Sequence, residues 1–110
     1  MTHLSLILHI VTRLIVKDGD PSLGHCWPPT TPIAVNAAVA GVFVDGRTPV
    51  VVGDAYNIHP GPCGVVPTHP VLTAVGSLTV FIGNMPVVRD TDLLSCGDIA
   101  KSLAGTVFAG

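Results

Sequence analysis

One short phrase occurs nearly three times in this sequence and constrains what the chain can fold into. Aligned on phenylalanine, "VFVDG" contains Phe43, "VFIGN" contains Phe81 and "VFAG" contains Phe108, at spacings of 38 and 27 residues. The first two copies run into a two-residue turn signal, Asp45-Gly46 or Gly83-Asn84. Such a turn between runs of β-branched and aromatic residues predicts a β-hairpin in each copy.

The strand after each turn begins with the same letters, "PVV", at residues 49–51 and 86–88. Proline is tolerated at the start of a strand, where its missing N–H is not needed. The early stretch "RLIVKDGD", residues 13–20, resembles the back half of such a unit, whereas the last residues resemble a front half. Joining the two ends of the chain therefore completes a third copy. The pattern predicts an all-β fold, and helical periodicity is possible only in the first dozen residues.

Composition supports many short strands in one domain. A chain of 110 residues holds one core, and a metal ion or disulfides would help to stabilise it. Apolar residues make up 48% and charged residues 11%, and the 12 Gly and 10 Pro are spread along the chain. The net charge of −2, without a basic stripe, argues against nucleic acid as a partner. Three cysteines cannot all pair within one chain, which favours a reducing compartment or a metal role.

The first residues stand apart from the repeats. The apolar run "LSLILHIVTRLIV" has 13 residues, against about 20 for a membrane-spanning helix, and it includes His9 and Arg13. It also lacks the basic start and the small-residue cleavage site of a signal peptide. We therefore expect residues 1–12 to be an added N-terminal element or a buried strand, and residues 13–110 to form the repeat domain. His3 and His9 are given no role.

The long loops between the hairpins carry the residues with metal chemistry. His69 lies 12 residues before Phe81, and Cys96 lies 12 residues before Phe108. His25 occupies the corresponding loop of the first copy. If three copies pack around a pseudo-threefold axis, equivalent loops converge at one end of that axis, and His59 can add a fourth ligand.

Three imidazoles and one thiolate form a closed tetrahedral set that suits structural Zn²⁺, at about 2.0 to 2.1 Å from nitrogen and about 2.3 Å from sulfur. The same donors also accommodate iron or another divalent metal, because affinity order alone does not select the metal, and we rank iron below zinc. Cys26 and Cys63 compete for the sulfur position, and we interpret both as small buried apolar residues.

The remaining polar residues predict no catalytic site. Asp18, Asp20, Asp54 and Asp92 each end a strand-like run, where aspartate commonly caps a turn. Trp27 is better explained by packing against the metal loop than as a recognition platform. No serine lies in a nucleophile motif. We therefore expect a protein that is not an enzyme.

The motifs "GSLTVFIGNMPVVRDTD", "LSCGD" and the terminal "GTVFAG" resemble those of the PAAR-repeat proteins, whose name comes from a Pro-Ala-Ala-Arg motif. That motif stands here as Pro86-Val87-Val88-Arg89. The first copy, Pro49-Val50-Val51-Val52, lacks the arginine but keeps Gly53-Asp54 after it. The resemblance runs from about Arg13 to Gly110.

This resemblance implies a small cone of three pseudo-threefold β-hairpin repeats with long metal-binding loops. In the family, three histidines and one cysteine near the point hold zinc, and His25, His59, His69 and Cys96 are the matching residues. The base of the cone sits on a homotrimeric spike of the VgrG or phage-hub type, one copy per trimer. Such a tip belongs to a phage tail baseplate or a type VI secretion apparatus and contacts the target membrane transiently. The alternative is a small metal-dependent enzyme or metal-binding regulator, which would need an open coordination position.

Overall fold

The computed structural model of the chain describes residues 12–59 and 67–110. Within these ranges the secondary structure consists of seven two-residue strands and one helical turn, so the predicted all-β fold is confirmed. The predicted N-terminal element, residues 1–12, lies outside the described part except for Thr12. The elements are β1 (Arg13–Leu14), β2 (Pro32–Ile33), α2 (Asn36–Val39), β3 (Ala55–Tyr56), β4 (Val71–Leu72), β5 (Phe81–Ile82), β6 (Met85–Pro86) and β7 (Phe108–Ala109).

Both turn signals form the predicted hairpins. β5 pairs with β6 across Gly83-Asn84, and Val44 pairs with Arg47 across Asp45-Gly46. All four turn residues have positive φ, between 50° and 75°. Two consecutive left-handed residues are the requirement of the type I′ turn, and Gly, Asn and Asp adopt that conformation at low cost.

The two ends of the described chain pair with each other. β1 runs antiparallel to β7, with Leu14 opposite Phe108 and Arg13 opposite Ala109. The β5–β6 pair has the same register, with Pro86 opposite Phe81 and Met85 opposite Ile82. Thr12 and Gly110 therefore occupy the positions that Asn84 and Gly83 fill in the β5–β6 turn.

Three buried valines link the hairpins through a closed ring of backbone hydrogen bonds. The N–H of Val16 donates to the carbonyl of Val88 (3.0 Å), that of Val88 to Val50 (2.8 Å), and that of Val50 to Val16 (2.8 Å). All three valines are completely buried. Each segment thus donates to one neighbour and accepts from the other, and the three segments are equivalent.

An aspartate turn follows each segment of this ring, as predicted for Asp20, Asp54 and Asp92. Each carboxylate accepts the backbone N–H of the residue three positions earlier, at 3.0, 3.0 and 2.8 Å. The residue before each aspartate has positive φ; these residues are Gly19, Gly53 and Thr91. All three aspartates are buried, at 0 to 2% exposure.

The apolar side chains form two clusters, one on each side of the ring. Successive side chains of an extended segment point to opposite faces, so neighbouring ring residues such as Val50 and Val51 enter different clusters. The cluster among the hairpins comprises Ile15, Ala37, Val44, Val51, Ile82, Val87 and Ala109. The cluster nearer the long loops comprises Val16, Val50, Tyr56, Val71, Val88, Leu94 and Ala100.

A three-stranded antiparallel sheet, β2-β3-β4, extends from the ring toward the long loops. Pro32, Tyr56 and Val71 form its buried row. The helical turn α2 follows β2 and was not predicted, because four residues are too few to show helical periodicity.

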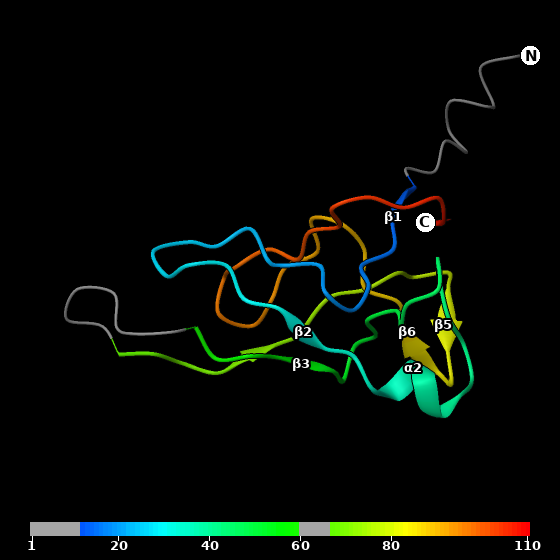
Figure 1. The fold of residues 1–110 in the computed structure, drawn as a ribbon, viewed down its shortest axis with the longest axis horizontal. Helices are drawn as coiled ribbons and strands as arrows, with labels where there is room; N and C mark the ends of the chain where they lie inside the picture. Colours follow the sequence, from blue (N-terminus) through cyan, green and yellow to red (C-terminus); the bar gives the residue numbers. More distant parts are fainter. Residues whose placement is uncertain (1–11, 60–66) are drawn as a thin grey trace, which may run out of the picture.

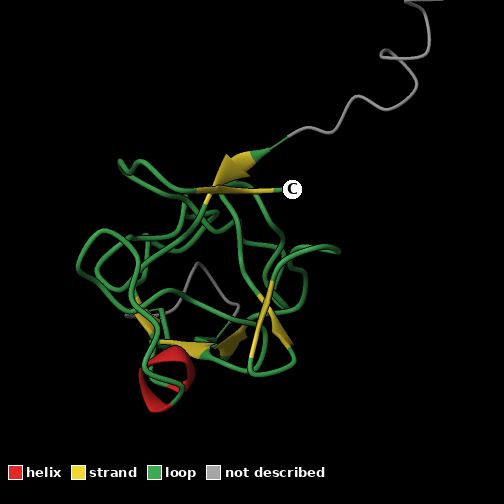
Figure 2. Cartoon of the chain, turned by 90° about the vertical axis from the view of Figure 1, so that its right-hand side faces the viewer, coloured by secondary structure: helices red, strands yellow, loops and turns green. Residues whose placement is uncertain are grey.

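The hairpins and the long loops lie at opposite ends of the molecule. Figure 1 shows α2, β5, β6 and the paired chain ends at one end, and the loops around residues 25, 69 and 96 toward the other. Viewed from the hairpin end, strand pairs and the helical turn lie around the periphery of the structure (Figure 2). Among the described residues no helix is long and apolar enough to cross a membrane.

Candidate metal centre

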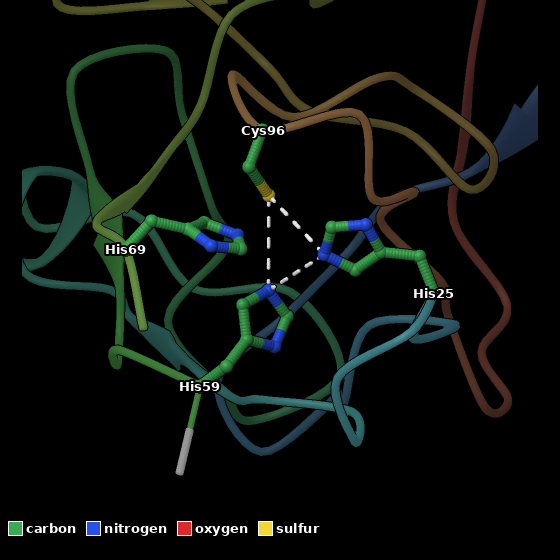
Figure 3. A group of neighbouring side chains, drawn as sticks. All are labelled: His25, His59, His69 and Cys96. Atoms are coloured by element: carbon green, nitrogen blue, oxygen red, sulfur yellow. Dashed lines mark hydrogen bonds between the residues drawn. The ribbon is translucent and has the colours of Figure 1, made fainter. Parts of the chain in front are cut away.

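Four side chains from distant parts of the sequence meet at the end opposite the hairpins. His25, His59, His69 and Cys96 each offer a ligand atom, and these atoms lie within 4.8 Å of one another (Figure 3). These are the four ligands predicted from the sequence, and the structure brings all of them together. The group is therefore a candidate site for a metal ion.

Each ligand sits in a segment fixed by the neighbouring strands. His25 lies in a bend at residues 25–27, and Cys96 lies in the turn that connects Leu94 to Asp98. His59 follows β3 and His69 precedes β4. Since β3 and β4 are hydrogen-bonded to each other, one arm of the sheet delivers two of the imidazoles.

The register of the ligands differs in one respect from the sequence interpretation. Counted from the aspartate turns, His25 and His59 are each the fifth residue after the aspartate, and Cys96 is the fourth. By this count His69, rather than His59, is the additional ligand. Counting back from phenylalanine paired His69 with Cys96 instead, because the segments between the ligands and the next hairpin differ in length.

The distances among three of the donor atoms are close to those of tetrahedral coordination. His25 Nε2 lies 3.2 Å from His59 Nε2, and Cys96 Sγ lies 3.9 and 3.7 Å from these two nitrogens. With ordinary zinc–ligand bond lengths, the edges of a tetrahedron measure about 3.3 Å between nitrogens and about 3.6 Å between nitrogen and sulfur. The ligand atom of His69 lies within 4.8 Å of these three and completes the set.

The tautomer of His59 is set by the backbone. Its Nδ1 lies 2.8 Å from the carbonyl oxygen of Pro28, which can only accept a hydrogen bond. Nδ1 therefore carries the proton, and the lone pair of Nε2 points into the cluster. The His59 side chain is buried, so this orientation is held by its surroundings.

His69 contributes a second sign that a ligand is expected here. Its Nε2 is buried and has no hydrogen-bond partner among the described residues. A buried polar atom without a partner is costly, and a metal ion would satisfy it. Trp27 packs against His69 and His25, with ring centroids 4.3 and 5.0 Å apart, which confirms its predicted packing role.

The expectation for Cys26 is wrong. The bend at residues 25–27 buries Trp27 and leaves Cys26 exposed, and the Cys26 sulfur is disulfide-bonded rather than a buried thiol. Cys96 is a free, half-buried cysteine. Cys63 lies outside the described residues.

One charged residue beside the cluster was missed. The carboxylate of Asp98 lies 3.8 Å from His59 Nε2, and both side chains are buried. An aspartate after Gly97 in a turn gives no sign of such a role in the sequence. An open pocket of about 460 Å³ borders the cluster and is lined by His25, Trp27, His69, Pro70, Ser95 and Cys96.

No protein-family model matches this sequence, and no curated protein shows significant similarity to it.

Proposed function

We propose that this chain is a non-enzymatic, metal-stabilised tip that caps and sharpens the trimeric central spike of a contractile injection machine. The observation that carries the proposal is the closed ring of hydrogen bonds among Val16, Val50 and Val88. A single chain with three equivalent segments can match three identical chains across one contact.

In this proposal the chain is a small cone of three pseudo-threefold hairpin repeats. The shared register of β5–β6 and β1–β7 and the Val44–Arg47 pair across the first turn support it. The hairpins form the broad base, and the four-ligand cluster lies near the point. The resemblance to PAAR-repeat proteins agrees with this arrangement.

The metal in the proposal is one structural Zn²⁺, held by His25, His59, His69 and Cys96. When bound, the ion cross-links the loops without performing chemistry, because four protein donors fill a tetrahedron. In a small domain such a cross-link contributes directly to folding free energy, since the site is absent in the unfolded chain.

The base of the proposed cone presents apolar side chains at equivalent positions. Phe43, Phe81 and Phe108 are 59, 52 and 56% exposed, although phenylalanine is usually buried. Exposed aromatic residues of this kind mark protein interfaces. We assign this surface to a homotrimeric spike of the VgrG or phage-hub type, with one copy of this chain per trimer.

Such a protein would be made in the bacterial cytoplasm. It would then travel as the spike tip of a virion's tail baseplate or of a type VI-like secretion apparatus, and pierce the target membrane in transient contact.

The partner proposal is tested by measuring the mass of the complex with the cognate spike protein. One copy per trimer is expected, and affinity should fall little between low and high salt because the contact is largely apolar. Three copies per trimer, or no binding, would overturn the capping function while leaving the metal centre untouched.

The metal proposal is tested by elemental analysis of the purified chain, with one zinc per molecule expected. Cys96→Ser should lower both metal content and thermal stability, whereas Thr68→Ala, on the exposed loop beside His69, should change neither. Metal-free protein that keeps its full stability would contradict a structural site. A bound metal together with hydrolytic activity that Cys96→Ser abolishes would favour the enzyme alternative.

A further inference from the structure

Asp98 is a buried carboxylate without a lysine or arginine partner. It is 1% exposed, and among the described residues the one Lys, Arg or His nitrogen near its carboxylate is Nε2 of His59, at 3.8 Å. Asp54 also lacks a cation, but Asp98 differs from all the other buried aspartates because its contact is with a residue of the ligand cluster. Asp20 lies near Lys17 and Asp92 near two arginines, while Asp54 accepts an amide N–H from Asn36.

Three neutral donors hold the Asp98 carboxylate in place. Oδ1 accepts the backbone N–H groups of Gly24 and Ile99, at 2.8 and 2.7 Å, and Oδ2 accepts the hydroxyl of Ser22 at 2.5 Å. The Ser22 oxygen itself accepts the N–H of Thr30, so its proton is directed at the carboxylate. These donors orient the carboxylate toward His59, but none of them neutralises its charge.

The missing positive charge can be supplied at the ligand cluster. The proton on His59 Nδ1 is hydrogen-bonded to the carbonyl of Pro28. Nε2 is therefore an uncharged metal ligand that faces the cluster. A divalent ion with one thiolate and three neutral imidazoles carries a net charge of one positive unit. The Asp98 carboxylate carries one negative unit, so the metal, its four ligands and Asp98 together are neutral.

We infer that Asp98 is a specificity-determining residue that favours a divalent cation over a monovalent one at the four-ligand site. The inference rests on the proposed metal centre. The relevant competitor is Cu⁺, since thiolate and imidazole ligands also suit this soft ion. Cu⁺ with the thiolate is already neutral, so Asp98 would leave an uncompensated negative charge in a poorly screened interior.

The test is the ratio of dissociation constants for Zn²⁺ and Cu⁺, measured by chelator competition on wild-type protein and Asp98→Asn. Copper is handled anaerobically with ascorbate as the reductant. Zn²⁺ affinity should fall about 10- to 100-fold in Asp98→Asn, the usual effect of removing an outer-sphere partner of a metal ligand. Cu⁺ affinity should not fall, so the preference for Zn²⁺ should drop at least about tenfold.

Ser22→Ala is the matched control, because it removes a hydrogen bond from the same carboxylate without changing charge. It should change both affinities in parallel. A parallel loss in Asp98→Asn as well would show that Asp98 only supports the loops and would overturn the inference.

If Asp98→Asn does not fold, Asp98→Glu replaces it. This variant keeps the charge, so the wild-type preference for Zn²⁺ should persist even if both affinities fall. Loss of that preference with the charge retained would refute the inference. Wild-type protein that binds neither ion would refute the inference together with the metal centre, whereas zinc binding with an unmoved ratio refutes the inference alone.

Discussion

At the scale of single residues, the buried hydroxyl of Tyr56 lowers the stability of the core. It is 2% exposed, and its hydroxyl has no hydrogen-bond partner among the described residues. Phenylalanine has the same shape and no polar group to desolvate. Tyr56→Phe should therefore raise the free energy of unfolding by about 1 kcal/mol, or leave it unchanged. Urea denaturation at neutral pH measures the effect, and a loss of more than about 1 kcal/mol would point to a partner of the hydroxyl.

The same residue gives the fold a pH dependence in the alkaline range. Burial, followed by the nearby charges of Asp20, Asp98 and Asp54, raises the pKa of Tyr56 well above its ordinary value of 10.0. The unfolded chain ionises near the ordinary value while the folded chain stays neutral. This contribution to stability is complete below about pH 10 and is lost as the pH rises further. The stability difference between Tyr56→Phe and wild type should therefore widen above about pH 10, and parallel curves would contradict the pKa shift.

At the scale of elements, the three aspartate turns have the same backbone conformation but differ in the side chain that contacts the carboxylate. Arg89 donates to Asp92 through Nε and a terminal nitrogen, at 3.0 and 2.9 Å. In the structure Val51, one position before the residue that the motif aligns with Arg89, stands in place of the cation. Asn36 of α2 donates to Asp54 instead, at 2.7 Å. The helical turn thus supplies the hydrogen bond that a basic residue supplies elsewhere.

These partners predict a graded series of costs. Asp92→Ala removes several hydrogen bonds and leaves Arg89 buried without its counter-ion, which should cost about 3 to 5 kcal/mol of unfolding free energy. Asp54→Ala leaves only neutral donors unpaired and should cost about 1 to 3 kcal/mol. Asp18→Ala, at an exposed position of the first turn, should stay within about 0.5 kcal/mol of wild type. Chemical denaturation ranks the three, and equal losses at Asp54 and Asp92 would contradict a charge-dependent term.

At the scale of the whole molecule, the pairing of β1 with β7 means that the fold does not require its termini to lie between these two strands. Gly110 and Thr12 already occupy the positions of a two-residue turn. A circular permutant of residues 12–110 can therefore join Gly110 directly to residue 12, with Thr12→Asn, and begin at Asn84 and end at Gly83; its parent for comparison is the linear chain of residues 12–110. It should fold with the parent's metal content and unfold cooperatively, within about 2 kcal/mol of the parent protein, because only one loop closure has been exchanged.

A permutant opened between Val50 and Val51 is the control, because the new ends fall inside the hydrogen-bonded ring. It should fail to fold cooperatively in thermal denaturation monitored by circular dichroism. If both permutants fold equally well, the ring does not organise the structure.

Features that depend on local residue types could be predicted from the sequence, whereas contacts between distant residues could not. The turns at residues 45–46 and 83–84 were predictable because their residue types fix the backbone, and the four ligands because histidine and cysteine are rare and gather in the long loops. The role of Asp98 could not be predicted, since it depends on a contact with His59, which lies 39 positions away in the sequence. The exposure of Cys26 follows from a bend that only the packing of Trp27 explains.

The closed ring of Val16, Val50 and Val88 also has a mechanical consequence. An open sheet has an outermost strand, so a load can peel it one bond at a time, beginning at that edge. The ring has no edge segment at which separation could begin, because each segment is hydrogen-bonded to both of the others. A force along the line from hairpins to loops is therefore shared by three equivalent segments, and the body resists until all three yield together.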